Sequence, residues 1–327
     1  MLSAPHLLVE GVAITSFAIG CNHAFIYLRG EVVHVYRRLL QAVREAYDAG
    51  HLGKNIHGSG FDLDVTVHAG AGAYICGEET ALMESIEGKK GPPRFKPPFP
   101  ANFGVYGRPT NINNTETYAS VPVILEKGGD WFLNLGKPNN GGTKLFSVSG
   151  HVNNPGNFEV PMGLPFKELL EMAGGVLNGN KLKAVIPGGS SMPVVPGDVM
   201  LKLDMDYDSI QKAGSGLGSG AVIIMDETTC MVDALYRLSE FYYDESCGQC
   251  TPCREGTGWL ARILHRIEHG EGEPGDLERL KRVADNIEGR TICALGEAAA
   301  WPVQSFLKHF YDEFKYHIDH KRCLVGH

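Results

Sequence analysis

The feature that most constrains this chain is a run of three cysteines at three-residue intervals, Cys247, Cys250 and Cys253, in the segment CGQCTPC. A fourth cysteine, Cys293, follows 40 positions later in the segment TICALG. Three thiolates on a loop bent by glycine and proline can converge on one face of a cubane, and a distant cysteine can supply the remaining corner. The spacing therefore predicts one [4Fe-4S] cluster held by four cysteine ligands.

Zinc is the alternative occupant of these four cysteines. Structural zinc sites usually draw their ligands as two separated pairs, so the arrangement of three plus one favours a cluster without excluding zinc. The remaining cysteines have no partner at ligand spacing, and we expect them to be small buried hydrophobic residues without metal chemistry. They are Cys21, Cys76, Cys230 and Cys323. Clustered thiols of this kind indicate a reducing compartment, and we expect the cytoplasm.

The charge balance limits the partners. The chain carries 38 acidic and 30 basic residues, a net charge of -8, which argues against a nucleic-acid partner and against an anionic membrane surface. The most apolar early stretch, Leu7 to Gly20, is shorter than the roughly 20 residues that span a bilayer. We therefore expect no direct membrane insertion, so any membrane association must run through another subunit.

The length of 327 residues predicts more than one domain. Residues 23–29 and 61–68 have the composition of strands and flank a helical stretch over 32–49, which predicts a βαβ unit with parallel strands. From residue 143 the pattern changes to short strands and turns, with strands expected within 144–152, 158–160 and 183–186. Beyond residue 227 apolar residues recur at helical spacing, over 231–241, 256–267, 277–287 and 303–314. The predicted domains are an α/β domain over 1–136, a small α+β module over 143–226 and a helical bundle over 227–327.

A glycine-rich turn, GAGAYICGEETAL, follows the second of these strands and opens a helix near Gly77. A strand, a glycine turn and a helix N-terminus form the usual setting for a nucleotide or flavin phosphate, although the spacing is not GxGxxG. Glu78 and Glu79 would repel a phosphate at that helix end. We therefore expect them to accept hydrogen bonds from sugar hydroxyls or from the reduced cofactor. Ordinary stabilisation of the positive end of a helix by acidic residues explains them equally well.

Two neighbouring segments carry further candidate ligand-binding residues. The asparagine-rich run 111–117 precedes a helix that includes residues 121–125, so its side chains either cap that helix or bind a ligand. The proline-rich stretch 88–109 is predicted to be a structured loop without a helix. Its Phe99 and Tyr106 either stack on a planar ring or pack the loop itself.

Several segments in this order resemble the family of flavin- and NADH-binding subunits of respiratory complex I, the NADH:quinone oxidoreductase. The segments are GAGAYICGEETALMESIEGKKGPPRFKPPFPANFGVYGRPTNINNTET, GTKLFSVSGHVNNPGNFEVPMGLPFKELL, AVIPGGSS, GSGLGSGAVIIMDET, ESCGQCTPCREG and TICALGEAAAWPV. The resemblance implies an α/β fold class with a truncated Rossmann-like flavin domain, a ubiquitin-like β-grasp module of the SLBB type, and an all-α helical bundle with an iron-sulfur cluster.

The resemblance also implies a function and a set of site residues. FMN, NAD(H) and a [4Fe-4S] cluster are the implied cofactors, with hydride transfer from NADH to FMN followed by single-electron transfer to the cluster. Glu79 is the implied catalytic residue, and other subunits of the complex I peripheral arm, especially the small [2Fe-2S] subunit, are the implied partners. The residues implied to bind FMN and NADH are Tyr74, Gly77, Glu78, Glu79, Phe99, Asn113, Asn114 and Thr117, and the cluster ligands are Cys247, Cys250, Cys253 and Cys293.

The front of the chain departs from this resemblance. The family carries a glycine-rich segment of the GRGGAGFPTG kind to which no residues of this sequence correspond, so we expect this polypeptide alone to bind FMN weakly or not at all. Three other interpretations remain open. The chain is a non-catalytic scaffold that holds only the cluster, a diaphorase subunit of an NAD-linked hydrogenase or formate dehydrogenase, or a zinc-stabilised binding module.

Overall fold

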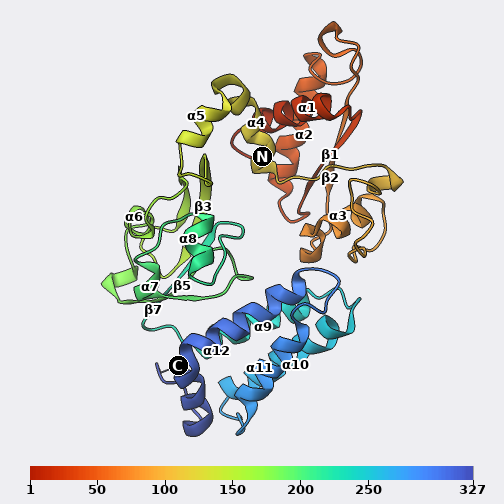
Figure 1. The fold of residues 1–327 in the computed structure, drawn as a ribbon. Coiled ribbons are helices and arrows are strands. Elements are labelled where there is room, and N and C mark those ends of the chain that lie inside the picture. The colour runs from red at the N-terminus through yellow and green to blue at the C-terminus, as the bar shows by residue number, and fades with distance from the viewer. Residues whose placement is uncertain (327) are drawn as a thin grey trace. The chain divides into compact units, whose positions relative to one another are not determined.

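The computed structural model describes residues 1–326, and the chain divides into two compact units, Met1–Phe132 and Leu133–His327 (Figure 1). Each unit has its own hydrophobic core. No helix of the described part of the chain is long and apolar enough to cross a membrane.

The first unit is built on two parallel strands. Its elements are α1 (Pro5–Ile19), β1 (His23–Leu28), α2 (Val33–Asp48), η1 (Ile56–Gly58), β2 (Asp64–Ala69), η2 (Tyr74–Gly77), α3 (Glu79–Ile86), η3 (Val105–Gly107) and α4 (Thr115–Lys127), and α5 (Gly129–Asn134) crosses into the second unit. The strands pair in register from His23 opposite Asp64 to Leu28 opposite Ala69. This pairing confirms the predicted parallel βαβ arrangement.

Helices α1 and α2 cover the core of this unit. Leu39 and Val43 on the apolar stripe of α2 are buried with Ile26 and Leu28 of the first strand. Helix α1 corresponds to the apolar stretch that sequence reasoning considered only as a possible membrane span. It packs against α4 and buries Leu8 in the same core, which explains its continuous hydrophobicity.

The second unit starts with a five-stranded sheet in the order β4-β3-β7-β5-β6. Its elements are β3 (Thr143–Gly150), β4 (Gly156–Pro161), α6 (Phe166–Met172), η4 (Leu177–Gly179), β5 (Leu182–Ile186), β6 (Val195–Pro196), α7 (Gly197–Met200), α8 (Tyr207–Lys212) and β7 (Ala221–Asp226). The predicted strands within 144–152, 158–160 and 183–186 are confirmed. The sequence reasoning missed β7, although this strand lies at the centre of the sheet and pairs in parallel with β3.

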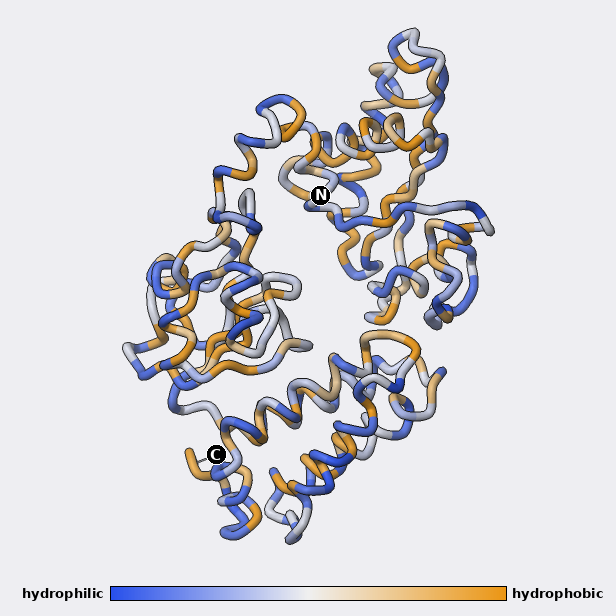
Figure 2. Tube along the Cα trace, in the orientation of Figure 1, coloured by the Kyte–Doolittle hydropathy of each residue, from blue (hydrophilic) through white to orange (hydrophobic). Residues whose placement is uncertain are grey.

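Four helices complete the second unit, as the helical spacing predicted. They are α9 (Met231–Asp244), α10 (Thr251–Glu268), α11 (Asp276–Ile287) and α12 (Leu295–His320). Hydrophilic and hydrophobic residues are interspersed along these helices (Figure 2). The apolar residues recur at the helical period, which gives each helix one face for the core. Helix α12 begins well before the predicted stretch 303–314 and contains Pro302, a residue type that usually ends a helical pattern.

The sheet and the helices of this unit share apolar contacts. Along β5, Ala184 and Ile186 belong to the core formed with the helices, whereas the intervening Val185 belongs to the core on the other side of the sheet. Successive side chains of a strand point to opposite faces, so β5 separates two cores. An ion pair between Lys183 and Glu313 of α12, 2.8 Å long and largely buried, joins the same two parts.

Candidate cofactor sites

The first three cysteines of the predicted cluster site lie at the start of α10. Cys250 is the N-cap of this helix, and Cys253 lies in its first turn and is 5% exposed. Gly248 adopts a left-handed conformation, and its carbonyl accepts a hydrogen bond from Arg254 at 3.1 Å. The loop is therefore folded back on the helix and held there by residues of the motif itself.

The fourth cysteine, Cys293, lies in the connection between α11 and α12. Its carbonyl accepts a hydrogen bond from the Thr291 hydroxyl at 2.8 Å. Helices α10 and α11 approach closely because Gly256 has no side chain, since a Cβ there would lie 2.7 Å from Ile287 Cδ1. This close approach brings the end of α11, and with it the loop of Cys293, toward the first turn of α10.

The other three cysteines of the motif lie near enough to Cys253 to influence its ionisation. Burial, and after it the proximity of Cys250, Cys293 and Cys247, raises the pKa of Cys253 to about 11, while a hydrogen bond with the Ser246 hydroxyl at 3.2 Å acts in the opposite direction. Several thiolates gathered in a partly buried site need a cation to compensate their charge. The N-terminus of α10 adds a positive helix dipole. This donor set fits a cluster with four thiolate ligands.

The glycine turn of the first unit leads directly into α3, as expected. Tyr74 and Gly77 lie in η2, and both are exposed. Glu78 is the N-cap of α3, and its Oε2 accepts hydrogen bonds from the amides of Thr80 at 2.8 Å and Ala81 at 2.9 Å. The capping role that the sequence left open for this carboxylate is therefore the observed one.

A lysine that the sequence reasoning did not single out lies between the two carboxylates. Lys96 donates hydrogen bonds to Glu78 Oε1 at 3.1 Å and to Glu79 Oε1. Burial opposes ionisation of Glu78, but hydrogen bonds from the α3 N-terminus and from Lys96 lower its pKa overall. Because the lysine offsets their negative charge, the expected repulsion of a phosphate at this helix end is weaker than the two glutamates alone suggest.

Arg94 anchors the proline-rich loop. Its guanidinium donates to Glu87 at 2.7 Å and to the Gly104 carbonyl at 3.1 Å, and it pairs with Glu84. The amide of Tyr106 also donates to Glu87, at 2.8 Å. Polar contacts to α3 thus hold the loop in place. Phe99 and Tyr106 remain 55% and 65% exposed, which leaves ring surface open to a ligand.

The asparagine run lies at the start of α4. Asn114 is the N-cap, and its Oδ1 accepts a hydrogen bond from the Glu116 amide at 2.8 Å. Asn113 donates to Asn111 at 2.8 Å, and the intervening Ile112 packs in one apolar cluster with Met83 of α3. This cluster holds the run against α3. Asn113, Asn114 and Thr117 are all exposed.

The glycine turn lies against the end of the first strand. A Cβ on Gly30 would lie 2.1 Å from the Gly70 carbonyl oxygen, so only glycine permits the two backbone segments to approach this closely. The turn is therefore fixed to the connection between β1 and α2. The connection after β1 and the turn after β2 therefore contact each other through backbone atoms and not through side chains.

One further group of metal-type side chains escaped the sequence reasoning. Cys230, His317 and Cys323 lie together in the second unit, although Cys230 and His317 are 87 positions apart. The single local signal was a histidine and a cysteine six positions apart near the end of the sequence.

Comparison with known proteins identifies the family. The chain is 56% identical over 316 residues to the F subunit of the NADH-quinone oxidoreductase of Rickettsia bellii (strain OSU 85-389), an overlap that covers 96% of this chain and 76% of that protein. This chain belongs to the family of NADH-quinone oxidoreductase F subunits. It is also 55% identical over 323 residues to the F subunit of Mycobacterium bovis (strain ATCC BAA-935 / AF2122/97), with 99% of this chain and 72% of that protein covered.

Three family models match this member of the F-subunit family in order. The Nuo51 FMN-binding domain matches residues 1–123, the SLBB domain matches 145–195, and the NADH-ubiquinone oxidoreductase-F iron-sulfur binding region matches 233–317. These matches confirm the predicted fold class and the prediction of an oxidoreductase subunit with FMN and an iron-sulfur cluster.

This chain also resembles the solved structure of an enzyme that is not named as a quinone oxidoreductase. The crystal structure of an NAD+-reducing [NiFe]-hydrogenase in the H2-reduced state aligns with a TM-score of 0.87 and 32% sequence identity. The alignment covers 96% of this chain and 52% of the hydrogenase chain. The chain thus spans about half the length of that chain.

Proposed function

We propose that this chain is the electron-input subunit of an NADH:quinone oxidoreductase. In this proposal it passes electrons from NADH through FMN to a [4Fe-4S] cluster held by Cys247, Cys250, Cys253 and Cys293. The observation that carries the proposal is the 56% identity over nearly the whole chain to a protein named for that reaction. Three of the four thiols lie at the start of α10, and Cys293 is near enough to influence the pKa of Cys253, which supports the cluster end of the path.

Bound FMN would supply the chemistry of a hydride acceptor that releases electrons one at a time. The residues of the chain bind and orient the reactants. We assign Glu79 to the nucleotide because Glu78 is already engaged in capping α3, so Glu79 is the carboxylate better able to accept hydrogen bonds from ribose hydroxyls. Lys96 limits the negative charge that an incoming phosphate meets.

The remaining cofactor-binding residues that we assign lie on neighbouring segments, and all of them except the half-buried Glu78 are exposed. Tyr74, Gly77 and Glu78 belong to the glycine turn. The exposed side chains of Asn113, Asn114 and Thr117 offer polar groups to the flavin. The exposed ring of Phe99 offers a stacking surface to the nicotinamide nucleotide.

We assign the domains to residues 1–136, 143–226 and 227–327.

The cysteine ligands have a defined environment in this proposal. The α10 N-terminus stabilises the negative charge of a thiolate-ligated cluster, and the Ser246 hydroxyl lies within hydrogen-bond distance of Cys253 Sγ. Hydrogen bonds to ligand sulfurs and partial burial are the means by which a protein sets a cluster potential.

The test uses the assembled complex that contains this chain, with NADH-dependent ferricyanide reduction as the readout. Replacing Glu79 by Gln removes a charged hydrogen-bond acceptor worth about 1.5–3 kcal/mol, so kcat/KM for NADH should fall by about 10- to 100-fold. Glu168→Gln, at an exposed position on α6, is the matched control. An unchanged kcat/KM in Glu79→Gln would contradict the assigned role.

A diaphorase subunit of an NAD-linked hydrogenase is the second candidate, favoured by the TM-score of 0.87. The higher identity to the F subunits of NADH-quinone oxidoreductases favours the quinone reductase. Nickel in the purified complex together with hydrogen-dependent NAD+ reduction would support the hydrogenase. Quinone reduction without nickel would support the first proposal.

The partners that we propose are other peripheral-arm subunits of complex I, in particular a small [2Fe-2S] subunit. Association with the inner membrane is then peripheral and runs through those subunits, in a cytoplasmic location. Co-purification of a second iron-sulfur polypeptide with this chain from the membrane fraction would support the assignment. Recovery of the chain without any such polypeptide would contradict it.

A further inference from the structure

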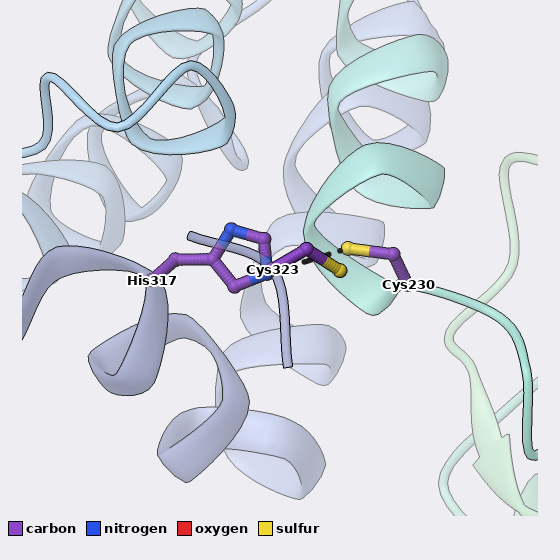
Figure 3. A group of neighbouring side chains, drawn as sticks. All are labelled: Cys230, His317 and Cys323. Carbon is purple, nitrogen blue, oxygen red and sulfur yellow. Dashed lines mark hydrogen bonds between the residues drawn. The ribbon is translucent and has the colours of Figure 1, made fainter. Parts of the chain in front are cut away.

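The second unit contains a group of soft metal ligands apart from the four-cysteine motif. Cys230 is the N-cap of α9, His317 lies in the last turns of α12, and Cys323 follows that helix (Figure 3). One ligand atom of each residue lies within 4.8 Å of the ligand atoms of the other two. The Cys230 sulfur and His317 Nε2 are 3.5 Å apart.

The surroundings of this group fix how the imidazole is oriented. Glu268 Oε2, at the end of α10, lies 3.6 Å from His317 Nδ1 and 3.7 Å from the Cys230 sulfur. When Nδ1 carries the proton, Nε2 is the ring nitrogen that can bind a metal together with the sulfur. A histidine that ligates a metal is commonly held in this way, by a carboxylate at its other ring nitrogen.

Burial disfavours the ionised form of these thiols unless a cation is bound. Cys230 is 2% exposed and His317 is fully buried. Burial, and after it the negative charge of Glu268, raises the pKa of the Cys230 thiol. Two thiolates beside a carboxylate would be strongly disfavoured in this core on their own, whereas a divalent cation compensates their charge.

We propose that Cys230, His317 and Cys323 bind a zinc ion, with Glu268 orienting the imidazole. Two thiolates and one imidazole are the ligand types of protein zinc sites. Binding of Zn²⁺ releases the two thiol protons to solvent, so no oxidant or reductant is needed. The site differs from the cluster in its ligands and in its place in the fold.

The function of this site is structural. Helix α12 ends at His320, Lys321 adopts a left-handed conformation, and the chain turns back so that Cys323 packs against the helical core. Lys321 also donates to the Gly272 carbonyl. Zinc would join the start of α9, the end of α12 and the returning tail, in addition to the hydrogen bond that the Met231 amide of α9 donates to Glu313 of α12 at 2.8 Å.

The test measures metals on the whole, cluster-loaded chain, prepared under reducing conditions and incubated with EDTA. Elemental analysis should find one zinc per chain in addition to iron. X-ray absorption at the zinc edge should show sulfur at about 2.3 Å and nitrogen at about 2.0–2.1 Å. Cys323→Ala and Cys230→Ser should lose the zinc, and Cys21→Ala, a cysteine of the first unit, should keep it.

Iron content separates loss of the site from loss of the fold. Serine is a good N-cap, and Cys323 lies in the tail, so both variants should retain iron while zinc falls to background. Absence of zinc from the unaltered chain would overturn the proposal. So would zinc retained in the Cys230→Ser, Cys323→Ala double variant, or an absorption spectrum with four sulfur ligands.

Discussion

The ion pair between Lys183 and Glu313 gives the sharpest test of how the sheet and the helices of the second unit are joined. Lys183 is 17% and Glu313 7% exposed, and the lysine also donates to the Thr229 carbonyl at 2.6 Å. Glu313 in turn accepts from the Met231 amide at 2.8 Å. Replacing the lysine by methionine leaves a carboxylate buried without its cation.

Removing one partner of a buried pair costs about 3–5 kcal/mol, and the residual exposure of the lysine favours the lower end, about 3 kcal/mol. For a unit of roughly 200 residues, each kcal/mol shifts the melting midpoint by about 2–4 °C, so Lys183→Met should lower it by about 6–12 °C. The matched control is Lys281→Met, because the Lys281–Asp285 pair is exposed on α11. Its cost should be below about 1 kcal/mol.

The assay is thermal unfolding of the cluster-loaded chain, followed by circular dichroism at one fixed scan rate because unfolding of such proteins is often irreversible. A second substitution, Glu313→Gln, should restore part of the loss in the Lys183→Met background. It removes the uncompensated charge and keeps an oxygen acceptor for the Met231 amide. Equal midpoints for Lys183→Met and Lys281→Met would refute the reasoning.

Three further predictions concern the cofactor sites and the first unit. Cys253→Ser should abolish most of the iron content and the EPR signal of the reduced cluster, and full iron incorporation would contradict the ligand assignment. Burial opposes ionisation of Glu87, but its hydrogen bonds more than offset this and lower its pKa to about 2. Its contribution to stability is therefore complete above about pH 4.5 and is lost as the pH falls toward 2, so Glu87→Gln should flatten acid unfolding of the first unit over that window, and an unchanged profile would count against it. Gly30→Ala should displace the glycine turn and reduce the FMN content of the complex, whereas Gly129→Ala, where a Cβ meets no atom within 4 Å, should leave it unchanged; equal FMN content in the two variants would argue against the close approach.

Local patterns predicted much of this architecture. The parallel strands β1 and β2, the helix α2 and the four C-terminal helices all carry the periodicity of their type. Strand β7 was missed because AVIIMD is a continuous apolar run, which does not distinguish a strand buried on both faces from a buried helical segment. Helix α12 was underestimated at its start because proline usually ends a helical pattern.

The candidate sites also differ in how far the sequence alone predicts them. The four cysteines were predictable because three of them are close in sequence and share one spacing. Lys96 lies 17 positions from Glu79, and Cys230 lies 87 positions from His317, so only the folded chain brings each pair together. Contacts between such distant positions depend on tertiary packing, for which a single sequence carries no local signal.

Strand β5 has a consequence for dissecting the protein into parts. Ala184 and Ile186 face the helices, so a fragment ending after β7 would present them to solvent together with Val194 and Met225. An exposed apolar sheet face of this kind promotes self-association. The SLBB module of this chain is therefore a poor candidate for expression by itself or for transfer into another protein, unless the residues on that face are first made polar.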